Sequence, residues 1–184
     1  MCIRDRATDV RDDAAIADAT LWQAELALRA GELDTAVARF NHAAERYRAV
    51  ESRVGESLAN IGLGRVLIER ELWDEGVRPP EEELPRLREM EQPSAQVLAW
   101  LTIGQGRRGK QELLPALKAF RDAQTIAHNA GNQLLESQAW QGVARILLDS
   151  DDFAGAAAPF DSAIALVRGL AGRLKDTAAR GTYL

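Results

Sequence analysis

The sequence predicts an all-α protein, an α-solenoid of about four antiparallel helix hairpins. Three observations lead to this prediction. Large and small residues recur every 40 residues, apolar residues follow one another at steps of three and four, and residues that end helices separate these runs. The composition agrees with it, because 46% of the 184 residues are apolar but only 5% are aromatic, which suits helices rich in alanine and leucine.

The 40-residue repeat is clearest around residues 97–123. One set of residues there comprises Trp100, Gly104, Ala116, Phe120 and Ala123. Forty residues later the chain has Trp140, Ala144, Ala156, Phe160 and Ala163. Earlier units have Asn60, Gly64, Gly76, Pro80 and Glu83, and before them Thr20, Ala24, Ala36, Phe40 and Ala43. A period of this length is typical of solenoids, in which each hairpin buries its apolar face by stacking on the next.

The repeat divides the chain into units at about 17–56, 57–96, 97–136 and 137–176, with the start of a further helix at the C-terminus. We assign residues 10–184 to this helical repeat domain. Residues 1–9 lack helical periodicity, and their opening hexapeptide MCIRDR resembles one found at the front of machine-assembled reading frames. We expect this segment to be disordered or an artefact of assembly.

In the first unit a helix is predicted over residues 10–30. Gly31 should end it, because glycine reaches positive φ just past a helix end without a clash of a Cβ atom. A second helix should begin near Leu33, which makes an antiparallel hairpin with a very short turn.

The second unit is irregular in its second half. Its first helix is predicted over residues 56–70. Pro79, Pro80 and Pro85 follow, and a proline inside a helix removes a hydrogen bond and clashes with the preceding turn, at a cost of about 3 kcal/mol. We therefore expect a turn or short helix over residues 72–77 and a new helix from Pro79 or Pro80, since proline is tolerated at a first helical position.

The third unit should contain helices over residues 94–108 and 111–129, with a turn around Gly109 and with Pro115 early enough to be accommodated. In the fourth unit the first helix should run to about Leu148 and the second over 153–170. Pro159 should kink the second helix or delay its start to near Ala157. Beyond Gly172 the repeat predicts another helix.

Charge and composition exclude several classes of protein. The net charge of −5 argues against nucleic-acid binding, which needs clustered Lys and Arg. A single cysteine, Cys2, excludes an internal disulfide framework, and His42 and His128 make no metal-ligand set with it. No apolar run is long enough to span a membrane. We expect a cytoplasmic protein with no cofactor, no metal and no membrane contact.

The repeated residues resemble the tetratricopeptide repeat (TPR) family. Its pattern of Trp, Leu-Gly, Ala and Phe is matched by Trp100, Ile103-Gly104, Ala116 and Phe120 and by the corresponding residues of the fourth unit. The resemblance covers about residues 16–170. The period of 40 instead of 34 is similar to the extended repeats of bacterial signalling and transcription regulators, and the second unit lacks the Trp and Phe.

This resemblance implies a right-handed superhelix whose first helices line a concave groove for a peptide or a partner domain. By register, the groove residues are Leu21, Trp22, Glu25, Leu58, Ile61, Arg65, Leu101, Thr102, Gln105, Arg108, Gln141 and Arg145. The Lys and Asn set by which some relatives hold a chain-terminal carboxylate is absent.

Arg65, Arg108 and Arg145 suggest a locally basic strip in this groove, suited to a partner with Asp or Glu beside apolar anchors. The alternative is that these arginines are solvated or pair with Glu69 and Asp149.

A nucleotide site is a competing interpretation. Residues 104–110, GQGRRGK, fit the spacing of a phosphate loop. Such a loop needs a preceding strand and a Ser or Thr after the Lys, whereas Gln111 stands there and the repeat predicts a turn between helices. No His, Ser or Cys accompanies the carboxylates in a catalytic spacing, so we do not expect an enzyme.

Two functions remain. The first is a non-catalytic protein–protein interaction module, part of a larger regulatory protein. The second is a structural spacer or self-association solenoid within a multidomain ATPase-type regulator. Uncovered apolar faces at residues 14–28 and 160–170 would favour the second, because terminal repeats need polar caps.

Overall fold

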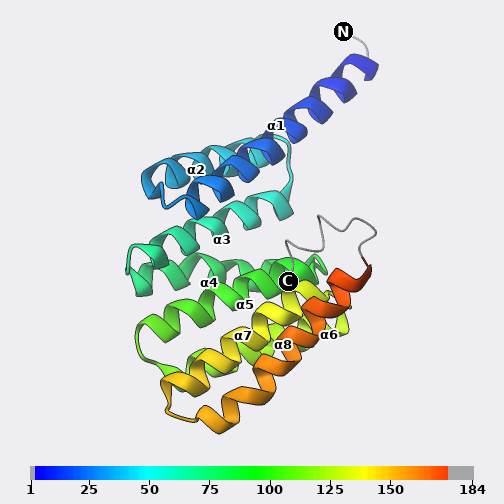
Figure 1. Ribbon diagram of the computed structural model, residues 1–184. Helices are drawn as coiled ribbons and strands as arrows, with labels where there is room; N and C mark the ends of the chain where they lie inside the picture. The colour runs from blue at the N-terminus through cyan, green and yellow to red at the C-terminus, as the bar shows by residue number, and fades with distance from the viewer. Residues whose placement is uncertain (1–2, 174–184) are drawn as a thin grey trace. The chain divides into compact units, whose positions relative to one another are not determined.

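The computed structural model describes the backbone of residues 3–173 and the side chains of residues 13–173. This part of the chain forms eight α-helices that pack as sequential antiparallel pairs (Figure 1). They are α1 (Ile3–Arg29), α2 (Leu33–Ala49), α3 (Arg53–Glu69), α4 (Trp73–Glu89), α5 (Pro93–Gly109), α6 (Leu113–Asn129), α7 (Gln133–Asp149) and α8 (Phe153–Arg173). The predicted all-α class and the hairpin arrangement are confirmed.

The chain divides into two compact units. The N-terminal unit is Met1–Ala95 and the C-terminal unit is Gln96–Leu184. We describe each unit by itself.

Helices and turns alternate with a period of 20 residues. Helices α2 to α7 have 17 residues each, and three residues separate every pair of consecutive helices. The middle residue of each turn has a φ between 52° and 76°; these residues are Gly31, Glu51, Glu71, Glu91, Gln111, Gly131 and Asp151. In the turn after α6, the amide of Gly131 donates to the carbonyl of His128 and that of Asn132 to Ala127, as in a Schellman cap.

This turn geometry corrects one prediction. Gly109 is the last residue of α5, and Gln111 takes the left-handed conformation instead. Five of the seven turn residues are not glycine. The left-handed conformation is strained for a residue with a Cβ atom, so we infer that the packing of the flanking helices stabilises these turns.

The predicted break in the second unit is wrong, because α4 runs unbroken through Pro79, Pro80 and Pro85. The reason is its close packing on α3. A Cβ atom on Gly64 would lie 2.6 Å from the carbonyl oxygen of Gly76 and 2.9 Å from Cδ of Pro80. The two backbones therefore touch, and the burial of Val77, Leu84 and Leu87 along the same helix offsets the lost hydrogen bonds.

The ends of the array also differ from expectation. Helix α8 begins at Phe153 although Pro159 lies inside it, so a late start near Ala157 is wrong. Helix α1 begins at Ile3, within the segment predicted to be irregular. The further helix predicted beyond Gly172 falls on residues 174–184, outside the described residues.

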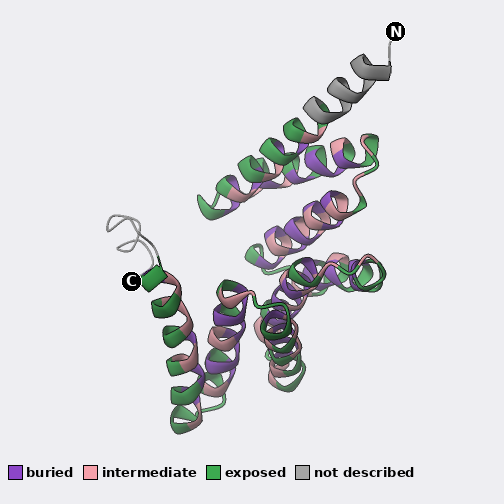
Figure 2. Ribbon diagram, turned by 90° about the vertical axis from the view of Figure 1, so that its right-hand side faces the viewer, coloured by how far each residue is buried: buried purple, intermediate pink, exposed green. Residues whose placement is uncertain are grey.

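The small positions of the repeat are buried, as predicted, along the sides on which neighbouring helices meet (Figure 2). Aromatic rings from the second helix of a hairpin lie against glycines of the next helix. A Cβ atom on Gly62 would overlap the ring of Phe40, and one on Gly142 would overlap the ring of Phe120. Both rings are buried, whereas that of Phe160 is only half-buried.

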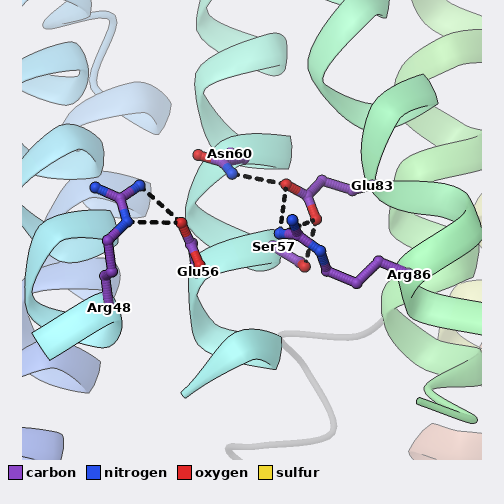
Figure 3. Close-up of polar contacts among 6 residues, drawn as sticks. All are labelled: Arg48, Glu56, Ser57, Asn60, Glu83 and Arg86. Atoms are coloured by element: carbon purple, nitrogen blue, oxygen red, sulfur yellow. Dashed lines mark hydrogen bonds and ion pairs between the residues drawn. The ribbon is translucent and has the colours of Figure 1, made fainter. Parts of the chain in front are cut away.

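The second hairpin replaces these apolar contacts with a buried polar cluster (Figure 3). Glu83 occupies the position that is alanine in the other units and is 6% exposed. Its carboxylate accepts hydrogen bonds from Ser57 Oγ at 2.6 Å and Asn60 Nδ2 at 2.7 Å, and Arg86 lies 3.3 Å away. These partners allow a carboxylate to remain inside the packed helices.

The Gly142 contact gives a stability prediction. Gly142→Ala should destabilise the chain by about 1–3 kcal/mol, because the added methyl group overlaps the Phe120 ring. Gly169→Ala is the matched control in α8, where nothing lies within 4 Å of the added atom, and it should stabilise by about 0.5–1 kcal/mol. Urea unfolding of both variants measures the difference; equal effects would contradict this packing.

Candidate functional site

The twelve predicted groove residues all lie on the first helices of the hairpins. In the N-terminal unit they are on α1 (Leu21, Trp22, Glu25) and α3 (Leu58, Ile61, Arg65). In the C-terminal unit they are on α5 (Leu101, Thr102, Gln105, Arg108) and α7 (Gln141, Arg145). Nine of them have exposed or partly exposed side chains.

Ile61, Leu101 and Thr102 are the exceptions, with exposed fractions of 2%, 7% and 1%. Leu101 packs in the same core cluster as Phe120, and the hydroxyl of Thr102 donates to the carbonyl of Leu98 at 2.8 Å. Side chains with so little exposed surface belong to the core and do not line an open groove. A helix inside the array has neighbours on more than one side. A prediction that allows it only one buried face therefore counts too few buried residues.

Two of the three groove arginines are neutralised by ion pairs. Arg65 Nη1 lies 2.5 Å from Glu25 Oε1, which links α3 to α1. Arg108 makes two hydrogen bonds to Asp149, at 2.5 and 3.1 Å, which link α5 to α7. Arg65 thus pairs with Glu25 where Glu69 was the predicted partner, and the Asp149 pair agrees with the alternative interpretation.

A cavity of about 660 Å³ lies on the surface of the last hairpin. Its lining residues are Gln141 and Arg145 of α7 and Phe160, Ala163, Ile164, Val167 and Arg168 of α8. The structure therefore brings together two predicted groove residues and five that the sequence analysis did not assign to a site. The floor is apolar, and a guanidinium group stands on each helix.

Two of the apolar lining positions are buried in earlier hairpins. Phe40 and Phe120 correspond to Phe160 by the repeat and are 0% and 3% exposed. Ala44 corresponds to Ile164, which is 45% exposed, and is itself 6% exposed. In those hairpins the phenylalanine lies against a glycine of the following helix, Gly62 for Phe40 and Gly142 for Phe120. Stepping through the sequence by 40 would have identified these residues as one surface.

The structure also bears on the metal-site, phosphate-loop and membrane alternatives. Among the described residues no group of His, Cys, Asp and Glu could hold a metal ion. Residues 104–109 of the phosphate-loop spacing lie inside α5, so that loop and its preceding strand are not formed. None of the helices described here is both long enough and apolar enough to cross a membrane.

Neither a scan against protein-family models nor a search of curated proteins finds a match. Solved structures do share the fold. One is a crystal structure of a Rap protein complexed with Competence and Sporulation Factor, with a TM-score of 0.71 over 80% of this chain. The chain folds like a Rap protein. Its sequential hairpins are consistent with TPR-like repeats.

The likeness to the Rap protein is one of fold alone, because the sequences are 15% identical. This chain spans 42% of the length of that Rap chain.

The Arg108–Asp149 pair predicts a pH dependence of stability. The hydrogen bond from Arg108 lowers the pKa of Asp149, burial opposes this, and the charges of Arg108 and Arg145 lower the pKa further. The pair therefore stabilises the fold fully above the unfolded pKa of about 4, and this contribution is lost as the pH falls through the folded pKa. Because the pair is solvent-exposed, we expect less than about 1 kcal/mol.

Asp149→Asn should remove this contribution at pH 7 and make unfolding less dependent on pH below about 4. Urea unfolding between pH 2 and 7 tests it. If the free energy of unfolding falls as steeply with decreasing pH in the variant as in the unaltered chain, the pair contributes no pH dependence.

Proposed function

We propose that this chain is a non-catalytic module that binds a segment of a partner protein, within a larger cytoplasmic regulatory protein. The observation that carries the proposal is the cavity of about 660 Å³ on α7 and α8, where the apolar side chains of Phe160, Ile164 and Val167 lie among polar and cationic residues of both helices. A cavity with this lining can bury the apolar face of a helix or peptide and pair with its charges.

The charges of the cavity specify the partner further. Arg145 and Arg168 flank the apolar side chains of Phe160, Ile164 and Val167. A partner segment with apolar anchors beside Asp or Glu would bury the anchors and pair its carboxylates with the two guanidinium groups. Exposed groove residues on the first helices, such as Trp22 and Gln105, are proposed as further contacts.

The fold comparison supports the same function. The Rap protein of similar fold was crystallised with Competence and Sporulation Factor, so the fold is compatible with a bound factor. We assign the chain, by its 40-residue period, to extended TPR repeats of the kind found in bacterial signalling and transcription regulators.

Self-association is a second candidate function. Trp22 and Leu26 on α1 are 68% and 65% exposed, and Phe153 on α8 is 68% exposed. Exposed apolar side chains such as these can bury one another when copies of the chain associate.

A peptide-display selection on the whole chain tests the proposed function. We expect enriched peptides to combine apolar and acidic residues and to lose at least about tenfold in affinity for Ile164→Asp, which places a charge on the cavity floor. Leu114→Asp is the control, because Leu114 is 80% exposed on α6 and does not line the cavity. Its affinity for the same peptides should be unchanged.

Absence of enrichment, or equal loss in both variants, would contradict the binding function.

Sedimentation of the chain tests the second candidate function, self-association. Concentration-dependent assembly that disappears in Trp22→Asp would support self-association, and a monomer at all concentrations would exclude it.

A further inference from the structure

A second cavity, of about 500 Å³, lies among α6, α7 and α8 of the C-terminal unit. It shares no residue with the cavity on α7 and α8 that we propose as the partner site, called the partner cavity below. Its polar lining residues are Gln124, His128, Gln133, Glu136 and Ser162. Trp140 forms an aromatic wall, and Leu166 and Ala165 on α8 contribute the apolar side.

Glu136 is the buried charge of this cavity. Its side chain is 9% exposed. Its Oε1 atom accepts a hydrogen bond from Gln124 Nε2 at 3.1 Å and lies 3.0 Å from His128 Nδ1. Gln124 is neutral, and His128 is charged only if protonated. Both contacts use Oε1, and no other described residue bonds to Oε2, so Oε2 can accept a bond from a ligand in the cavity.

The equivalent carboxylate of the N-terminal unit has an arginine partner, which Glu136 lacks in the described part of the chain. Glu56 and Arg48 stand 80 residues before Glu136 and His128. There, Arg48 donates to Oε1 of Glu56 from Nε at 3.0 Å and from Nη2 at 2.7 Å (Figure 3). The N-terminal unit thus provides a permanent cation for this carboxylate, and the C-terminal unit has a histidine in its place. A buried carboxylate without a permanent counter-charge is costly.

Trp140 adds a second reason to expect a cation. The equivalent position in α3 is Asn60, so the aromatic wall occurs here and not beside Glu56. The face of an indole ring attracts ammonium and guanidinium groups, at about 0.5–2 kcal/mol. The carboxylate and the indole ring that line this cavity therefore both favour a positively charged ligand.

We propose that this cavity binds an alkylammonium or guanidinium group, such as the side chain of a Lys or Arg in a bound peptide. The guanidinium of the chain's own Arg173 donates to Oε1 of Gln133, another lining residue, and makes no ion pair with Glu136 among the described contacts. A bound cation donates to Glu136 and stacks on Trp140, in the place that Arg48 fills for Glu56. This site is independent of the proposed partner cavity, and either can exist without the other.

Titration of the whole chain with N-acetylarginine methylamide tests the proposal. N-acetylcitrulline methylamide is the matched neutral ligand, with the same shape and no charge, and N-acetyllysine methylamide separates ammonium from guanidinium recognition. The readout is the indole NMR resonance of Trp140, assigned with Trp140→Phe. We expect millimolar binding of one or both cations and at least about tenfold weaker binding of citrulline.

Three variants locate the site. Glu136→Gln should weaken cation binding at least about tenfold, while Glu56→Gln, the equivalent change at a carboxylate already paired with Arg48, should leave it unchanged. His128→Arg copies the Arg48 arrangement and should abolish cation binding without lowering the melting temperature. This variant keeps the test decisive even if Glu136→Gln unfolds.

Arg173→Ala tests whether the guanidinium of Arg173 competes with added cations for the cavity. The affinity for the cations should be equal or higher in this variant. The proposal is overturned if neither cation binds at up to about 50 mM, if citrulline binds as tightly as arginine, or if His128→Arg binds the cations as well as the unaltered chain does.

Discussion

The structure depends on the contact between an aromatic ring and a glycine of the following helix. Phe40 lies on Gly62 and Phe120 lies on Gly142, in each case with the glycine 22 residues after the ring. No larger residue fits, because a Cβ atom at either glycine would overlap the ring. In the first and third hairpins the phenylalanine of the second helix is thus buried where the next helix supplies a bare backbone. These hairpins therefore bury part of their apolar surface by packing on the helix that follows.

Much of the fold follows from the sequence because this contact repeats. The period of 40, the small positions and the hairpins were predicted from residues that the packing constrains. The predicted break at Pro79 and Pro80 is wrong because a local rule was applied where packing decides: Gly64 and Gly76 bring α3 and α4 into backbone contact. The left-handed Gln111 was missed for the same reason, since helix stacking imposes a conformation that its side chain disfavours.

The candidate sites were predicted less well than the fold. Family register assigned Gln141 and Arg145 to the groove, and both line the cavity on α7 and α8, but it also assigned Ile61, which is buried. Register identifies positions that the units share, whereas the cavity among α6, α7 and α8 lies where the C-terminal unit has a different residue from the N-terminal unit. His128 stands there in place of the arginine that pairs with Glu56. Departures from a repeat are therefore the better signal for function.

The most direct test of the central claim is a double-mutant cycle of Gly142→Ala and Phe120→Leu, measured by urea unfolding. If the ring and the glycine fit against each other, alanine is tolerated once the ring is gone, and the two changes are non-additive by at least about 1 kcal/mol. Additive losses, within about 0.3 kcal/mol, would show that the two residues stabilise the chain independently and would contradict the account.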